Sequence, residues 1–110
     1  MWVETTDLSV SVSISEHETI VTAAGEIDMS TVGNLTSAVD AQLEARPAKI
    51  VIDMAGITFC DSLGLGSLVV LNRRAQKVGS RLLLRRPSEF LNRMLHVTGV
   101  HQTLAVEETA

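Results

Sequence analysis

The chain has 110 residues, of which 45% are apolar and 20% charged, and its formal net charge is −4. This length fits one domain with a core of its own, and this composition argues against a disordered chain. No apolar run approaches the roughly 20 residues of a membrane-spanning helix, and the N-terminus lacks the basic and apolar regions of a signal peptide. The single cysteine can form no internal disulfide. We therefore expect a cytoplasmic protein without a membrane segment.

The first part of the chain predicts a β-hairpin. Residues 8–14 alternate strictly between aliphatic residues and serine, which is the pattern of a strand with one buried face. A turn around residues 15–18 leads to a second strand over residues 19–24, which is expected to end at Gly25.

Helices and strands are expected to alternate in the rest of the chain. The expected elements are a helix with Val32, Leu35, Val39 and Leu43 at helical spacing that Pro47 stops, a buried strand at 50–52, a helix from 65 to 78, a buried strand at 82–84, a short helix after Pro87 and a strand near 103–106. Together with the hairpin, this order predicts one α/β domain over residues 1–110. Its small mixed sheet would have about four to five strands and be flanked by about three to four helices.

The charges are segregated along the sequence. Eight acidic residues and only one basic residue precede Lys49, whereas six basic and no acidic residues lie from Arg73 to Arg86. A basic patch can bind nucleic acid, but here it lacks interleaved aromatic residues and the whole chain is acidic. We therefore expect no direct nucleic-acid binding and interpret the basic residues as a solvated or partner-facing surface.

The segment from Phe59 to Gly66 lies between a buried strand and an apolar-periodic helix, which places Ser62 where a loop enters the helix. The free backbone amides of a first helical turn attract anions, so an added phosphate would be tolerated there. Gly64 and Gly66 would allow a partner to approach the backbone closely. A serine at this position can also serve only as the helix N-cap.

Other polar residues near the expected strand ends allow two interpretations. Asp28 can cap a helix that begins at about Met29 or line a switch surface, and Asp61 can bind loop amides or line the same surface. Asp53 is expected to hold a turn after its strand. Cys60 is expected to be a small apolar filler and Met29 to be core or rim. The three histidines show no metal-ligand spacing, so we expect neither metal nor cofactor.

Three segments in the same order and spacing resemble the STAS domain family, specifically its stand-alone anti-sigma factor antagonists. They are Gly25 to Asp28 (Gly-Glu-Ile-Asp), Asp61 to Gly66 (Asp-Ser-Leu-Gly-Leu-Gly) and Leu91 to Val100. The resemblance covers nearly the whole chain. It implies a small mixed sheet flanked by helices, and a regulatory protein rather than an enzyme.

The resemblance also implies a partner-switching function. The unmodified antagonist would bind an anti-sigma factor, itself a serine kinase with a histidine-kinase-like ATPase fold, and a sigma factor would be released. Phosphorylation of Ser62 would break the complex, and a PP2C-type serine phosphatase would reset it. The expected partner-binding residues are Asp28, Asp61, Ser62, Leu63, Gly64, Leu65 and Gly66. Leu63 replaces the Ser, Thr or Gly usual in the family, and the free protein is expected to be a monomer.

Two other functions compete with this hypothesis. Cys60 to Gly64 resembles the nucleophile elbow of hydrolases without its first glycine, with Glu89 and His96 or His101 as the only acid and base that follow. We consider the chain too small for that fold and expect no catalysis. The second alternative is a non-phosphorylated STAS docking module of a transport or sensory complex, in which the basic helix carries the interaction.

Overall fold

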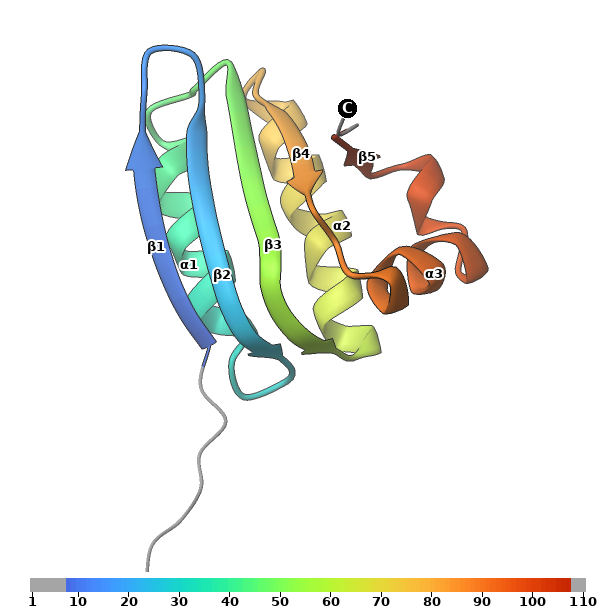
Figure 1. Ribbon diagram of the computed structural model, residues 1–110. Helices are drawn as coiled ribbons and strands as arrows, with labels where there is room; N and C mark the ends of the chain where they lie inside the picture. The colour runs from blue at the N-terminus through green and yellow to red at the C-terminus, as the bar shows by residue number, and fades with distance from the viewer. Residues whose placement is uncertain (1–7, 108–110) are drawn as a thin grey trace, which may run out of the picture.

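Five strands and three α-helices alternate over residues 8–107, the part of the chain that the computed structural model describes (Figure 1). Their bounds are β1 Leu8–Ile14, β2 Thr19–Ile27, α1 Val32–Leu43, β3 Lys49–Cys60, α2 Ser62–Lys77, β4 Arg81–Arg85, α3 Glu89–Val97, the 3₁₀ turn η1 Val100–Gln102 and β5 Ala105–Val106. The predicted mixed α/β fold is confirmed. None of the helices in this part of the chain has the length and apolarity needed to cross a membrane.

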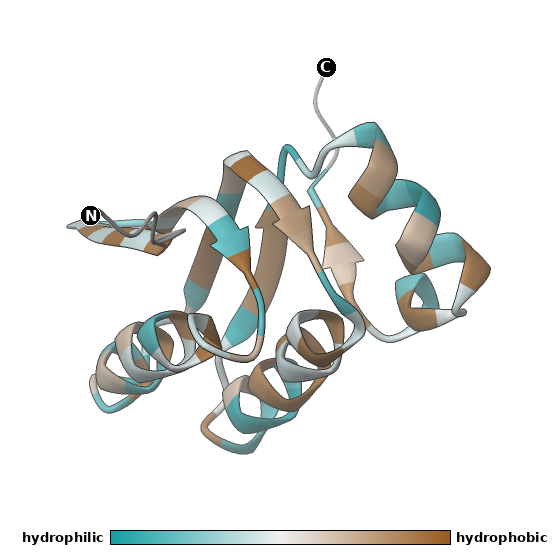
Figure 2. Cartoon of the chain, turned by 90° about the horizontal axis from the view of Figure 1, so that it is seen from below, coloured by the Kyte–Doolittle hydropathy of each residue, from teal (hydrophilic) through white to brown (hydrophobic). Residues whose placement is uncertain are grey.

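The strands form one sheet in the order β1-β2-β3-β4-β5, with β1 antiparallel to β2 and the other neighbours parallel. Parallel neighbours need a crossover, which α1 supplies between β2 and β3 and α2 supplies between β3 and β4. Both helices cover the same face of the sheet (Figure 2). Because β2 and β3 are parallel, both strands end at the same end of the sheet, and α1 and α2 begin there.

The core lies between this face of the sheet and the two helices. Aliphatic residues at the expected strand and helix periods fill it, and each is at most 4% exposed: Val21, Ala23, Ile50, Ile52, Met54, Leu35, Val39, Leu65, Leu68 and Leu71. Burial of this aliphatic surface drives the association of helices and sheet.

Charged side chains connect four strands. Arg85, at the end of β4, binds Glu107 at 2.7 Å and Glu18 at 3.2 Å, and Lys49 lies 3.3 Å from Glu18 and 3.7 Å from Glu107. The hydrogen bonds from Arg85 hold the pKa of both glutamates below its ordinary value. These contacts tie the start of β2 and β3 to the end of β4 and β5.

Strand β1 departs from its prediction at one end. Leu8 is buried and Val10 half-buried, as expected, but Val12 and Ile14 are 40% and 70% exposed. A hollow lined by Ile14, Gln42 and other residues lies between this end of the hairpin and the end of α1. The alternation correctly predicts the strand, and the prediction of a buried face is wrong where the helix does not cover it.

Two strands are longer than predicted. β2 continues past Gly25, whose φ is 119°, because irregularities in its register with β3 on either side of Gly25 absorb the change in backbone direction. β3 continues to Cys60, so Asp53 lies inside a strand and does not hold a turn after it. The sequence predictions for both strand ends are therefore wrong.

Asp53 is only 6% exposed, and its carboxylate pairs with Arg86, which has a φ of 52°. The amide of Ala55 also donates to this carboxylate, at 3.1 Å. Burial raises the pKa of Asp53, but the bonds from Arg86 and Ala55 outweigh burial and the pKa is lowered. Arg86, which follows β4, thus compensates the charge of a carboxylate that is buried inside β3.

Candidate functional site

The ends of β2 and β3 and the beginnings of α1 and α2 meet at one end of the molecule. Ile27 and Cys60, the last residues of β2 and β3, are neighbours in the parallel register. The amide of Asp61 then donates to the carbonyl oxygen of Ile27 at 3.1 Å. This bond fixes the start of α2 against the end of β2, and it brings the two motifs containing Asp28 and Ser62 together.

Ser62 is the first residue of α2 and is exposed. The N-cap is Asp61, whose Oδ1 atom accepts a hydrogen bond from the Gly64 amide at 2.7 Å, while its carbonyl oxygen accepts from Leu65. The interpretation of Ser62 as the N-cap is therefore wrong. Asp61 performs that role, which leaves the Ser62 hydroxyl outside the cap.

The residues that follow Ser62 divide into a buried and an exposed group. Gly64 and Leu65 are buried against the core, whereas Leu63 is 50% exposed and Gly66 is exposed. A Cβ atom on Gly66 would meet no other atom within 4 Å. Of these four expected partner-binding residues, only Leu63 and Gly66 face outward, and for them a contact with a partner stays a prediction.

Asp28 organises the turn between β2 and α1. Its Oδ1 atom accepts hydrogen bonds from the Ser30 hydroxyl at 2.8 Å, the Ser30 amide at 2.9 Å and the Thr31 amide at 3.1 Å. These bonds, led by the Ser30 hydroxyl, lower the pKa of Asp28 despite some desolvation. Helix α1 begins at Val32 with Thr31 as its N-cap, so the expected helix start near Met29 is wrong.

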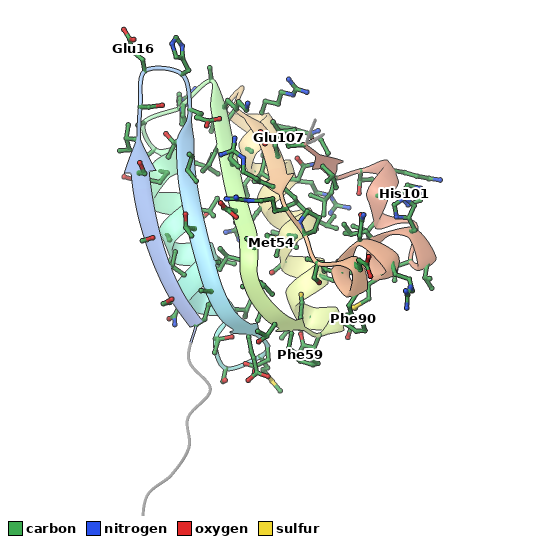
Figure 3. All side chains as sticks on the ribbon, viewed as in Figure 1. Glu16, Met54, Phe59, Phe90, His101 and Glu107 are labelled. Carbon is green, nitrogen blue, oxygen red and sulfur yellow. The ribbon has the colours of Figure 1, made fainter. Side chains whose placement is uncertain are left out.

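Three exposed apolar side chains belong to segments that meet at the end of the molecule that carries Ser62. Met29 in the β2–α1 turn is 77% exposed, Phe59 near the end of β3 is 41% exposed, and Leu63 is 50% exposed. Figure 3 shows Phe59 at the end of the molecule where β3 meets α2. We call these three residues the apolar rim. Sequence reasoning missed Phe59 and left Met29 as core or rim, although both directly flank the strand ends that carry the motifs.

Cys60, His96 and His101, which the hydrolase alternative names, have other roles in the structure. Cys60 is 2% exposed, and burial raises the pKa of its thiol to about 11, so it is an apolar filler as expected. The rings of His96 and His101 stack on each other with centroids 4.2 Å apart. Both rings line a hollow of about 650 Å³ beside Arg86 and Glu107, and Ser62 does not line it. Within residues 8–107, no group of His, Cys, Asp or Glu is arranged to hold a metal ion.

A comparison with known protein families identifies the family of this chain. A family model described as "Mlab, STAS domain" matches residues 10–107. The chain belongs to the STAS domain family. The expected resemblance is thus confirmed over almost all of the described structure.

Several proteins similar to this chain are named as antagonists of anti-sigma factors. The anti-sigma-B factor antagonist of Bacillus subtilis is 29% identical over 100 residues, which cover 91% of each chain. The anti-sigma-F factor antagonist RsfB of Mycobacterium tuberculosis is 26% identical over 106 residues, covering 92% of this chain and 84% of RsfB. The crystal structure of an anti-sigma factor antagonist from Mycobacterium paratuberculosis has a TM-score of 0.78 and 28% identity, and covers 93% of this chain and 86% of that one.

Proposed function

We propose that this STAS protein is an anti-sigma factor antagonist, controlled by phosphorylation of Ser62. Its partner is an anti-sigma factor that is also a serine kinase with a histidine-kinase-like ATPase fold, and binding it releases a sigma factor in the cytoplasm. The observation that carries the proposal is the exposed Ser62 at the start of α2, at the same end of the molecule as the apolar rim. The names of the similar proteins support the role of an anti-sigma factor antagonist. In this function the protein is a substrate and a ligand, and performs no catalysis itself.

The fold can accept a phosphate at Ser62. A phosphoserine carries about −1.5 to −2 charges at pH 7. The Gly64 amide is already bound by Asp61, but the amides of Ser62 and Leu63 belong to the first turn and have no intrahelical acceptor. The positive end of the helix favours a nearby anion by about 0.3–1 kcal/mol. We therefore expect phosphorylation to leave the fold unchanged.

The same phosphate opposes binding to a partner. The apolar rim has to lose water when a partner covers it, and a dianion beside it would then be desolvated as well. Asp61, next to Ser62, adds negative charge to the same place. A mismatched buried charge at an interface costs on the order of 2–5 kcal/mol, which corresponds to an affinity loss of about 30-fold or more. A PP2C-type serine phosphatase would remove the phosphate and restore binding.

Mass spectrometry tests this proposal directly. The purified protein is incubated with ATP, Mg²⁺ and each ATPase-type serine kinase of the same genome, and its intact mass and peptides are then measured. We expect a single added phosphate on Ser62 that is lost in Ser62→Ala. Ser67→Ala is the matched control, because Ser67 lies on the same helix but its hydroxyl donates to the Gly64 carbonyl oxygen at 2.6 Å. Binding to a kinase without any phosphate on Ser62 would overturn the phosphoswitch.

A docking module that is not phosphorylated is the second candidate. The outer face of α2 is exposed at Gly66, Val70, Arg73 and Lys77, so it offers an open backbone, a valine and two cations in a line. Stable co-purification with transport or sensory subunits in the absence of ATP, reduced by Val70→Ser and Lys77→Ser, would favour this candidate over the switch.

A further inference from the structure

Strand β1 forms the outer edge of the sheet at the end opposite to β5 (Figure 1). Among residues 8–107, only β2 pairs with it. Edge strands are usually protected from further pairing by charged residues, proline, bulges or short length. β1 has seven residues with no charge and no proline, and its register with β2 is uninterrupted. Its outer backbone is therefore an unusually open template for another strand.

The sequence of β1 is complementary to itself in the antiparallel direction. It reads Leu-Ser-Val-Ser-Val-Ser-Ile, and this pattern is symmetric about its central residue, Ser11. An antiparallel pair of β1 strands centred on Ser11 would place Leu8 opposite Ile14 and Val10 opposite Val12, while serines face serines. Each side chain would thus meet one of its own kind on the same face of the combined sheet.

The exposed aliphatic residues of β1 lie on the side where such a pair would bury them. Val12 is opposite Val21, which is fully buried under the helices, so Val12 and Ile14 point to the helix-covered face. They are nevertheless 40% and 70% exposed. A second β1 strand would bring Val10 and Leu8 of the other copy against them. This contact would explain two aliphatic side chains that the single chain leaves in water.

We propose that a second copy of this chain pairs with β1 in the antiparallel direction, centred on Ser11, and joins the two sheets into one. The inference replaces the expectation of a monomer and does not depend on the proposed phosphoswitch. One seven-residue strand from each copy makes a contact smaller than a standard interface of about 800 Å² per partner. The dimer is therefore expected to be reversible and concentration-dependent. The side-chain amide of Asn34 donates a hydrogen bond to the carbonyl oxygen of Leu8, the first residue of β1, at 3.4 Å.

Introducing a positive or a negative charge at Ser11 tests the pairing. Ser11 is exposed, so Ser11→Lys and Ser11→Glu should both fold, but each would place two like charges opposite each other at the centre of the dimer. In sedimentation equilibrium, we expect the wild type to dimerise as its concentration rises, each variant alone to dimerise at least several-fold more weakly, and an equimolar mixture of the two to regain association. Gln76→Lys, exposed on α2, is the charge-matched control and should behave as the wild type.

Cysteine cross-linking tests the register. Residues opposite each other in an antiparallel pair have Cα atoms about 4.5–5.5 Å apart, within the reach of a disulfide. Ser11→Cys should therefore form a covalent dimer on mild oxidation. The native Cys60 should not interfere, because it is buried. Ser9→Cys alone should not form such a dimer, since its two copies would lie about 13 Å apart along the strands, but it should cross-link to Ser13→Cys.

The outcomes separate cleanly. Association of the wild type that weakens with like charges at Ser11 and returns in the mixture, with the expected cross-links, supports the proposal. A wild type that stays monomeric at millimolar concentration overturns it. So does a dimer that is unaffected by both charged variants, or one that cross-links through Ser9→Cys alone, because the contact would then lie elsewhere or in another register.

Discussion

Gly64 lies so close to Ile27 that a Cβ atom on the glycine would be 2.7 Å from the Cγ2 atom of Ile27. The same atom would be 2.8 Å from the sulfur of Cys60. The first turn of α2 is therefore seated directly on the last residues of β2 and β3. This packing, together with the Asp61 cap, determines where the Ser62 hydroxyl emerges.

The two glycines of the motif should respond oppositely to alanine. Gly64→Ala forces Ile27 or Cys60 to move, and such overpacking is expected to lower the free energy of unfolding by about 1–3 kcal/mol. Gly66→Ala adds a Cβ atom to open space within a helix and should raise it by about 0.5–1 kcal/mol. Urea unfolding followed by circular dichroism measures both. Equal destabilisation by the two variants would contradict the packing described for Gly64.

Substitutions at Ser62 should separate binding from switching. Ser62→Ala removes the phosphoacceptor without adding charge, so it should bind the partner kinase like the wild type and stay bound when ATP is added. Ser62→Asp places a carboxylate beside the apolar rim and should bind about 30-fold more weakly. Isothermal titration calorimetry checks both variants. Wild-type affinity for Ser62→Asp would show that charge at this position does not control the complex.

The apolar rim should contribute to partner affinity and little to stability. Phe59→Ser and Leu63→Ser each remove a side chain that is about half exposed in the free protein. We expect each to weaken binding to the kinase by about 1–3 kcal/mol, while unfolding changes by less than about 1 kcal/mol. Val97→Ser, at an 80% exposed residue at the end of α3, is the matched control. If all three variants bind equally well, the partner does not cover the rim.

Stability should fall in acid. The pKa values of Glu18 and Glu107 are lowered in the folded protein, mainly by Arg85, so the unfolded chain binds protons first as the pH falls. Their stabilisation is present above the ordinary glutamate pKa of 4.5 and is lost as the pH drops through the lower folded values. The midpoint of thermal unfolding, measured by calorimetry, should decrease accordingly.

Replacing Arg85 tests the cause of this pH dependence. Arg85→Met removes the hydrogen bonds to both glutamates, so the slope of the unfolding midpoint against pH should become shallower below pH 4.5. Arg73→Met removes an exposed cation on α2 and should leave the slope unchanged. An identical slope in the Arg85→Met protein would mean that other carboxylates dominate the acid response.

Sequence patterns predicted the order and type of the elements because burial on one face or both dictates their periods. They failed where a distant residue decides the outcome. The chain continues through Asp53 as a strand because Arg86, 33 positions later, pairs with the carboxylate. Val12 fits the alternating pattern, but the extent of helix cover over β1 depends on how α1 packs, which no local pattern contains.

The candidate site was predicted only in part for a similar reason. The Asp-Ser-Leu-Gly-Leu-Gly segment locates Ser62 at the start of a helix, and the structure confirms that position. It could not show that Asp61 takes the capping role or that Gly64 faces inward. Met29 and Phe59 are found at the same end of the molecule because the parallel register of β2 and β3 brings together strand ends about thirty positions apart in the sequence.

Two requirements meet at Arg86: a left-handed backbone conformation and a positive charge beside Asp53. Its left-handed backbone favours glycine and costs about 1–2 kcal/mol for other residues, while the buried carboxylate of Asp53 requires a cation. Glycine would relax the main chain but leave a charge without its counterion, and an acidic residue would repel the carboxylate. Tolerance to substitution at this position should therefore be narrow and confined to long basic side chains, even though the arginine itself is largely in contact with solvent.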